Sequence, residues 1–261
     1  MLAILDGTVL PVSEARIPVT DDGLLRGDAV FEVIHLYGGL PFALEDHLAR
    51  MERSAHNLRL AFDPAAVRAD VETLLAANQE LEAALRVVVT RGGRRLAMVE
   101  PLKALPHTLA LATITYAPTR VLDGVKSLSY GANMLAGRLA RERGADEALL
   151  VTPHGRVLEG PTSAFFCSPD GETLVTPPLE DHVLDSITRR RLLALTEVIE
   201  RPVVRDELAG LREAFLASTL REVHPVHAID GAALPAAPGP LTAAAAVAIR
   251  ERIAQELGLP A

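Results

Sequence analysis

Residues 29–37 read Ala-Val-Phe-Glu-Val-Ile-His-Leu-Tyr and run directly into the glycine pair Gly38-Gly39. The segment is rich in β-branched and aromatic residues, and the glycines favour a tight turn, so we predict a strand that ends in a hairpin. Upstream, Leu2-Ala-Ile-Leu5 precedes Asp6-Gly7 in the same way. Because short strands separated by tight turns are typical of antiparallel sheets, the N-terminal part of the chain predicts antiparallel strands.

A helix is predicted after this hairpin, since apolar residues fall at spacings of four, three, four and three, which define one helix face: Leu44, Leu48, Met51, Ala55 and Leu58. Arg50 lies beside that face. We expect a second helix over residues 64–78, strands over residues 85–90 and 108–115, and loops over residues 92–106.

Residues 116–120, Tyr-Ala-Pro-Thr-Arg, interrupt this pattern and predict a linker at about residues 116–122. Residues 1–117 would form a smaller N-terminal α/β domain, and residues 118–261 a larger C-terminal domain with mostly antiparallel strands. In the second domain we expect helices at 133–143, 187–199 and 241–257, and strands at 148–152, 156–159, 213–217 and 223–229. The predicted fold class is α/β of the mixed α+β type, because hairpins are too frequent for a doubly wound parallel sheet.

Composition excludes several classes of protein. The 261 residues carry 26 basic and 34 acidic side chains, and the net charge of −8 argues against a nucleic-acid partner. No apolar run approaches the roughly 20 residues of a membrane span, and the N-terminus has no export pattern, so we expect a cytoplasmic protein without membrane contact. The single cysteine, Cys167, excludes an intramolecular disulfide and lies in an apolar run typical of a core.

The lysines are the most informative residues of the chain. There are 24 arginines and only two lysines, Lys103 and Lys126. A guanidinium cannot act as an amine nucleophile, so a position that needs Schiff-base chemistry must keep its lysine. Lys126 stands in Val125-Lys-Ser-Leu-Ser-Tyr130, where apolar neighbours would favour the neutral amine. The alternative is an ordinary, partly exposed lysine whose stem packs on apolar surface.

Three segments could bind an anion. The first is Ser186-Ile-Thr-Arg189, which offers backbone N–H groups and the Thr188 hydroxyl at a helix start. The second is Ser218-Thr219, which adds two hydroxyls after a strand. The third is Arg50, which could supply a bidentate guanidinium. Each also has an ordinary interpretation: a helix cap, a turn and a solvated helix face. Together they predict a phosphate cradle if the fold brings them together.

Two further features bear on the chemistry. Glu159 precedes Gly160, where its carboxylate could bind a cationic ring nitrogen or simply face solvent in a turn. His224 and His227 lie three residues apart in an extended segment, so their side chains should point to opposite faces, and we expect no metal site.

Taken in chain order, these segments resemble the class IV aminotransferases, the fold type IV enzymes of pyridoxal 5′-phosphate, over nearly the whole sequence. The resemblance is carried by residues 22–32, 47–51, 126–130 with 133–136, 144–148, 159–160, 176–178, 187–189, and 218–219 with 221–223. It implies that Lys126 forms the internal aldimine and that Glu159 contacts the pyridine nitrogen. It also implies that the phosphate is held by Arg50, Ile187, Thr188 and Thr219, with Ser186 and Ser218 beside them.

The resemblance further implies a homodimer, with the active site between two domains and near the dimer interface. The implied reaction moves an amino group between a small amino acid and a 2-oxo acid, with Lys126 as the base that moves the proton. D-amino acids such as D-alanine and D-glutamate are favoured. The alternatives are a branched-chain L-amino acid aminotransferase and 4-amino-4-deoxychorismate lyase, which releases pyruvate and 4-aminobenzoate; residues 218–222 look more like the transaminase pattern.

Departures from the family pattern bear on the substrate. Arg26 stands where the family usually has an aromatic residue, and His35 where it usually has arginine or lysine. Arg86 falls near a second substrate-facing position, and the pair Arg26 and Arg86 resembles a subgroup of D-amino acid aminotransferases that binds the α-carboxylate with two arginines. The alternative for Arg26 is a salt bridge to Asp22 or Asp28. Ala29, Ala164 and Ser186 replace the usual glycine, asparagine and glycine.

Overall fold

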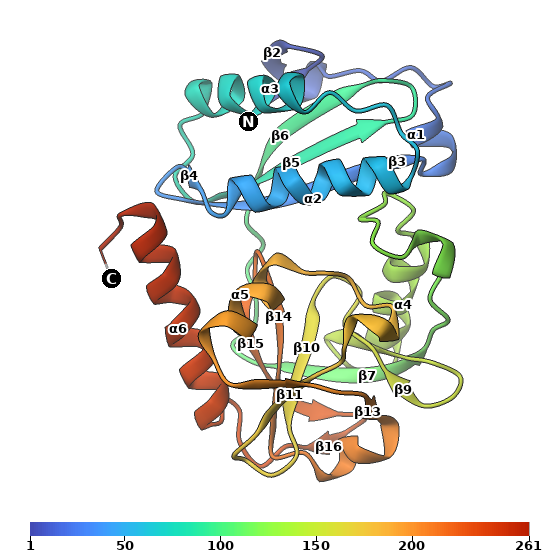
Figure 1. Cartoon of the computed structure of the whole chain (residues 1–261), viewed down its shortest axis with the longest axis vertical. Coiled ribbons are helices and arrows are strands. Elements are labelled where there is room, and N and C mark those ends of the chain that lie inside the picture. The colour runs from blue at the N-terminus through green and yellow to red at the C-terminus, as the bar shows by residue number, and fades with distance from the viewer. Residues whose placement is uncertain (261) are drawn as a thin grey trace. The chain divides into compact units, whose positions relative to one another are not determined.

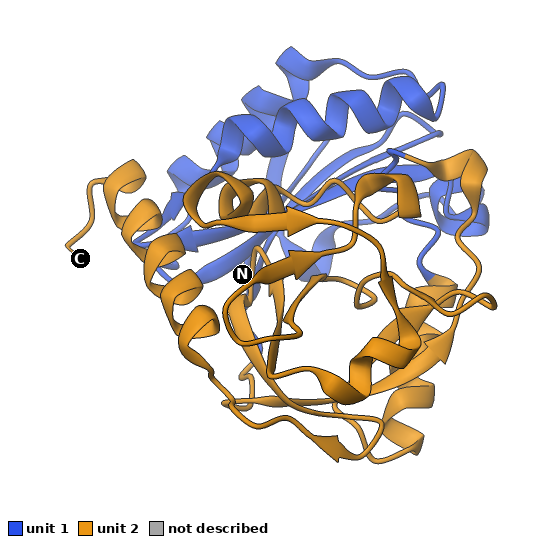
Figure 2. Cartoon of the chain, turned by 60° about the horizontal axis from the view of Figure 1, so that its bottom comes forward, with its two compact units in different colours: residues 1–103, 124–130 blue, residues 104–123, 131–261 orange. Residues whose placement is uncertain are grey.

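The structure is a computed structural model that describes residues 1–260. The chain forms two compact units (Figure 2), which we call unit 1 and unit 2. Unit 1 consists of Met1–Lys103 and Gly124–Tyr130, and unit 2 of Ala104–Asp123 and the residues from Gly131 onward. The domain boundary expected near residue 117 stays a prediction.

Unit 1 is built on a six-stranded sheet with the order β2-β1-β6-β5-β3-β4, in which every pair is antiparallel. The strands are β1 (Leu2–Leu5), β2 (Thr8–Pro11), β3 (Ala29–Tyr37), β4 (Leu40–Pro41), β5 (Ala83–Thr90) and β6 (Arg95–Pro101). The structure confirms the strand predicted over residues 29–37. The loop expected over residues 92–106 is wrong for its central part, because β6 lies between β1 and β5.

Three helices complete unit 1: α1 (Asp22–Arg26), α2 (Leu44–Asn57) and α3 (Pro64–Ala77). Helix α2 packs against β3, and α3 packs against β1 and β6 (Figure 1). Side chains alternate along β3, so Val30, Ile34 and Leu36 enter one apolar core with Met51 of α2 and other residues of both helices. Glu32 has the same parity, which places an acidic side chain on this core-facing side.

The Lys126 segment adds to the sheet of unit 1. The N–H of Phe31 donates to the carbonyl of Lys126 at 3.2 Å, and the N–H of Leu128 donates to the carbonyl of Ala29 at 2.8 Å. An antiparallel bridge between Val30 and Ser127 lies between these two bonds. Backbone pairing with the first half of β3 therefore fixes the position of Lys126.

Unit 2 contains a mixed sheet of ten strands among the described residues. Its order is β12-β11-β10-β14-β15-β7-β8-β9-β13, with β16 paired to β15. The strands are β7 (Leu109–Thr115), β8 (Glu147–Val151), β9 (Arg156–Val157), β10 (Ala164–Ser168), β11 (Leu174–Thr176), β12 (Val198–Glu200), β13 (Val203–Val204), β14 (Glu213–Ser218), β15 (Glu222–Ile229) and β16 (Ala232–Ala233). Three pairs are parallel and the others antiparallel, which confirms the mixed α/β class.

The helices of unit 2 are α4 (Gly131–Glu142), α5 (Ile187–Leu195) and α6 (Pro240–Leu257). Helix α5 is shorter than predicted from the sequence. It ends at Leu195, and the β-branched pair Val198-Ile199 instead opens β12, which pairs in parallel with β11. The apolar run after the helix thus gains backbone partners from the sheet, which local periodicity does not reveal.

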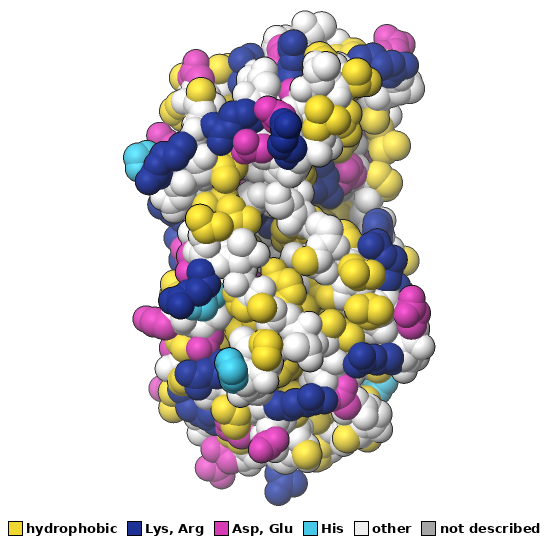
Figure 3. Space-filling view, turned by 90° about the vertical axis from the view of Figure 1, so that its right-hand side faces the viewer, with side chains coloured by type: hydrophobic (Ala, Val, Ile, Leu, Met, Phe, Trp, Pro, Cys, Tyr) yellow, Lys and Arg dark blue, Asp and Glu magenta, His cyan; other side chains and the backbone are white. Residues whose placement is uncertain are grey.

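The surface carries both signs of charge. On the face in Figure 3, Lys and Arg side chains are interspersed with Asp and Glu. Many arginines have acidic partners, as Arg68 has in Glu45 at 2.6 Å. Within residues 1–260, no helix is long and apolar enough to cross a bilayer.

Candidate active site

Lys126 lies against two aromatic rings of unit 1. Its Nζ is 4.4 Å from the ring centroid of Phe31 and 5.8 Å from that of Tyr130. The two rings meet edge to face, with centroids 5.1 Å apart. The backbone N–H of Lys126 donates to Ser54 Oγ on α2 at 3.1 Å. Backbone pairing, a helix hydroxyl and an aromatic wall together hold the amine in one place.

Arg86 shares this aromatic wall. It lies on β5 directly opposite Val33, and its guanidinium carbon is 5.9 Å from the centroid of the Phe31 ring. Its Nε and Nη2 donate to the two carboxylate oxygens of Glu100, each at 2.9 Å. The structure thus brings Lys126 and Arg86 to the same ring, while substrate binding by Arg86 stays a prediction.

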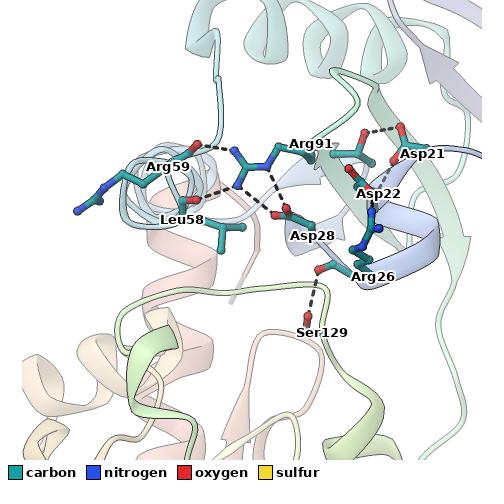
Figure 4. Close-up of polar contacts among 11 residues, drawn as sticks. Asp21, Asp22, Arg26, Asp28, Leu58, Arg59, Arg91 and Ser129 are labelled. Atoms are coloured by element: carbon teal, nitrogen blue, oxygen red, sulfur yellow. Dashed lines mark hydrogen bonds and ion pairs between the residues drawn. The ribbon is translucent and has the colours of Figure 1, made fainter.

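Arg26 makes the local ion pair that the sequence offered as its alternative role. It pairs with Asp22 one turn earlier in α1, and its side chain is 70% exposed (Figure 4). Asp28 is paired instead with Arg91, whose guanidinium also donates to the backbone carbonyls of Leu58 and Arg59. The role of the exposed Arg26 side chain toward substrate stays a prediction.

The same view shows how α1 is joined to the Lys126 segment (Figure 4). Ser129 Oγ donates to the carbonyl of Gly27 at 3.1 Å. A Cβ at Gly27 would lie 2.9 Å from that hydroxyl oxygen, so only glycine permits the close approach.

His35, the third residue expected to face substrate, is buried on β3. Its ring lies 3.9 Å from the ring of Tyr37, and its Nε2 is 3.7 Å from a carboxylate oxygen of Glu82. Contact of His35 with substrate stays a prediction.

Arg50 has a partner that the sequence analysis missed. Its Nε and Nη2 each donate to one carboxylate oxygen of Glu32 at 2.7 Å, and Glu32 is completely buried. His47, also fully buried, bonds the same carboxylate through Nδ1 at 2.7 Å. A signal was present: an acidic residue at a core-facing position of an apolar strand must find buried donors.

In unit 2, Glu159 follows β9 and is half-buried. One of its carboxylate oxygens accepts the N–H of Leu184 at 3.1 Å. Burial raises the pKa of Tyr116, and the negative charge of Glu159 acts in the same direction. Contact of the Glu159 carboxylate with a cationic ring nitrogen stays a prediction.

The predicted phosphate-binding segments of unit 2 lie at a helix start and a hairpin turn. Ser186 is the N-cap of α5, as predicted, and its hydroxyl accepts the N–H of Arg189 at 3.4 Å. Ile187 and Thr188 form the buried first turn. Ser218 ends β14 and Thr219 opens the turn to β15. Helix α5 packs against β14, the strand that ends at Ser218, and phosphate binding by the two segments stays a prediction.

Partly buried ionic contacts lie at both segments. The Arg189 side chain is 2% exposed, and its Nη2 donates to the carbonyl of Pro177 at 2.9 Å and to Glu200 at 2.5 Å. After the hairpin turn, Arg221 Nη2 donates to Glu147 at 2.7 Å. Such rigid support is what an anion site built from backbone N–H groups requires.

Other candidate groups do not form a site. His224 is buried and bonds the Pro106 carbonyl at 2.8 Å, whereas His227 is exposed and bonds Thr108, so the two rings lie in different surroundings. In the part of the chain that the structure describes, no three His, Cys, Asp or Glu residues are grouped as a metal site. Cys167 lies in the apolar core of unit 2, as predicted, and burial raises the pKa of its thiol to about 12.

Comparison with known proteins places this geometry in a family. Residues 29–229 match the family model of class IV amino-transferases. The chain is 31% identical over 280 residues to a D-alanine aminotransferase of Bacillus licheniformis, with 98% of each chain covered. It is 33% identical over 258 residues to a putative branched-chain-amino-acid aminotransferase of Methanocaldococcus jannaschii, with 88% of each covered.

Solved structures agree with this result. The crystal structure of the branched-chain aminotransferase of Thermoproteus uzoniensis with norvaline superposes with a TM-score of 0.89 at 29% identity, over 98% of this chain and 95% of that chain. The chain therefore belongs to the class IV aminotransferase family. It is a pyridoxal-phosphate-dependent enzyme of that family, whose substrates are amino acids and 2-oxo acids.

Proposed function

We propose that this enzyme moves an amino group between a small D-amino acid, such as D-alanine or D-glutamate, and a 2-oxo acid. The observation that carries the proposal is the position of Lys126, whose amine lies 4.4 Å from the Phe31 ring and whose backbone is paired with β3. The full-length similarity to a D-alanine aminotransferase supports D-amino acids as donors. We further propose a cytoplasmic homodimer.

The residue types present fit pyridoxal 5′-phosphate. Lys126 supplies a primary amine for its aldehyde, and the half-buried carboxylate of Glu159 suits its ring nitrogen. The start of α5, with the Thr188 hydroxyl, and the turn at Thr219 supply donors of the kind that bind phosphate. We assign Arg50 to the same phosphate, with Ser186, Ile187 and Ser218 completing the set. When bound, the cofactor acts as an electron sink for the carbanion left by loss of the Cα proton.

The protein side chains then divide the work. Lys126 Nζ removes the substrate Cα proton and returns it during the exchange of the amino group. Glu159 holds a proton at the ring nitrogen, because an adjacent carboxylate favours the cationic form. Arg86 binds the substrate carboxylate beside Lys126, and Arg26 and His35 contribute to the same recognition.

A visible absorption spectrum of the purified protein tests this function. The protein is mixed with D-alanine, D-glutamate, L-leucine or L-valine without any 2-oxo acid. Half-transamination bleaches the yellow chromophore, so bleaching by the D-amino acids supports the proposal. A protein without chromophore after addition of pyridoxal phosphate overturns it.

The second candidate function is branched-chain L-amino acid transamination, which the similarity to the Methanocaldococcus protein favours. Bleaching by L-leucine or L-valine alone would establish that function in place of the first. A yellow protein that none of the amino acids bleaches, but that releases pyruvate from 4-amino-4-deoxychorismate, would be the lyase.

A further inference from the structure

A three-residue ionic cluster lies within the core of unit 1. Glu32 Oε1 accepts the Nε–H of Arg50, and Glu32 Oε2 accepts both an Nη2–H of Arg50 and the Nδ1–H of His47. All three distances are 2.7 Å. We refer to Glu32, His47 and Arg50 as the buried ionic cluster.

The charges of this cluster follow from its surroundings. Burial by itself would raise the pKa of Glu32, but the Arg50 guanidinium and the His47 ring hold it at about 2, so Glu32 is ionised at neutral pH. Burial lowers the pKa of His47, so its ring is neutral and donates through Nδ1. The cluster thus contains one anion, one cation and one neutral ring, and its charges cancel.

Packing does not account for this arrangement. The neighbouring core-facing residues of β3, Val30 and Ile34, are fully buried and apolar. Apolar residues that replace a buried ion pair are often neutral or stabilising, so a charged group at position 32 brings no advantage to the core itself. What Glu32 does provide is geometry. It binds the Nε and Nη2 edge of the guanidinium and so fixes its plane.

We propose that Glu32 is a positioning residue for cofactor binding: it orients the guanidinium of Arg50 toward the phosphate, and His47 keeps the Glu32 carboxylate in place. This inference rests on the proposed function, in which Arg50 binds the phosphate. The helix face also links the two ends of the cofactor site, because Ser54 lies one turn beyond Arg50 on α2 and bonds the backbone N–H of Lys126.

Glu32→Gln tests the proposal, since glutamine preserves the shape of the side chain but removes its charge and one acceptor. The measurement is the absorbance titration of the full-length protein, freed of cofactor, with pyridoxal phosphate and with pyridoxal, which lacks the phosphate. We expect the Kd for pyridoxal phosphate to rise about tenfold or more and the Kd for pyridoxal to stay unchanged. If the buried pair had a purely structural role, its loss would leave the ratio of the Kd for pyridoxal phosphate to the Kd for pyridoxal unchanged.

Asp70→Asn is the matched control, because Asp70 is also buried in unit 1 and bonds Arg95 at 2.8 Å. This variant should lower the melting temperature and leave the ratio of the two Kd values as in the wild type. Arg50→Gln should lose the preference for the phosphate, and Glu32→Gln combined with Arg50→Gln should bind no more weakly than Arg50→Gln alone.

The outcomes separate the two proposals. A wild-type protein that binds no pyridoxal phosphate overturns the proposed function. The positioning role alone is overturned if Arg50→Gln changes the ratio of the two Kd values and Glu32→Gln leaves that ratio unchanged. If Glu32→Gln does not fold, Glu32→Asp keeps the charge but withdraws the carboxylate, and the same loss of phosphate preference is expected; wild-type preference there would also overturn the role.

Discussion

Ser54 Oγ accepts a hydrogen bond from the backbone N–H of Lys126 at 3.1 Å, across 72 positions of sequence. Ser54 is fully buried on α2, so its hydroxyl has little access to water. We expect Ser54→Ala to lower the free energy of unfolding by about 1 kcal/mol, because it leaves the Lys126 N–H without this acceptor. Urea denaturation measures the change. The exposed Ser13→Ala should differ from the wild type by less than about 0.5 kcal/mol, and equal effects of the two substitutions would contradict a special role for Ser54.

The two lysines allow a direct comparison. We expect Lys126→Arg to fold normally but to lose the yellow absorbance and all transamination, because a guanidinium does not form a Schiff base at neutral pH. Lys103→Arg should retain both properties. Absorbance spectra and amino-group transfer to a 2-oxo acid provide the measurement. Wild-type turnover by Lys126→Arg would be incompatible with the assigned chemistry.

Arg26→Ala separates a substrate role from the surface ion pair. The side chain is 70% exposed and its pair with Asp22 spans one helix turn, so the free energy of unfolding should change by less than about 0.5 kcal/mol. If Arg26 binds the substrate carboxylate, the KM for the amino acid should rise about tenfold, with a smaller effect on kcat. Steady-state kinetics with D-alanine decides the matter, and an unchanged KM would leave Arg26 with the ion pair alone.

Glu32 predicts a dependence of stability on pH. Its pKa in the folded protein is about 2, below the ordinary value of 4.5, so the unfolded chain takes up the proton first as the pH falls. Relative to protonated Glu32, the ionised carboxylate stabilises the fold fully well above pH 4.5, and this contribution, about 3 kcal/mol in total, is lost as the pH falls toward 2. The stability difference between wild type and Glu32→Gln should therefore shrink from about pH 5.5 to about pH 3. Denaturant unfolding at several pH values measures it, and a constant difference would contradict the assignment of charge.

Cys167 should be inert in the native protein. It is 1% exposed and burial raises the pKa of its thiol to about 12, so both access and the thiolate fraction are low. We expect iodoacetamide to react at least about a hundredfold more slowly with the native protein than with the protein unfolded in urea. Mass spectrometry follows the labelling; comparable rates in both states would show that the segment opens readily.

Local pattern predicted the elements whose signal is self-contained. Strand β3 follows from a β-branched run closed by glycines, and α2 from the spacing of its apolar residues. Strand β6 lies where the sequence analysis expected a loop, and two of its charged residues have partners elsewhere in the chain. Arg95 bonds Asp70 of α3 and Glu100 bonds Arg86 of β5, and these partners are brought together only in the folded protein.

Some residues of the candidate site could also be predicted from local sequence, and others could not. Lys126 could be singled out from residue types, because arginine has replaced nearly every other lysine. The Arg26–Asp22 pair could be anticipated from a spacing of four in one helix. The position of Glu32 in an apolar strand signals that it needs a buried donor, but the choice of Arg50 as that donor could not be anticipated, because it depends on which face of α2 lies over which face of β3. Periodicity predicts which face of each element is apolar. Which two faces pack together is determined by the tertiary structure.

The course of the chain limits how this protein can be recombined. Gly124–Tyr130 belongs to unit 1, although the residues on both sides of it belong to unit 2. A fragment that ends at Lys103 would keep the buried ionic cluster and lose the amine, and one that begins at Ala104 would carry the amine without its partner strand. Chimeras between relatives should therefore keep residues 124–130 and β3 from the same parent, whatever the origin of the sequence between them.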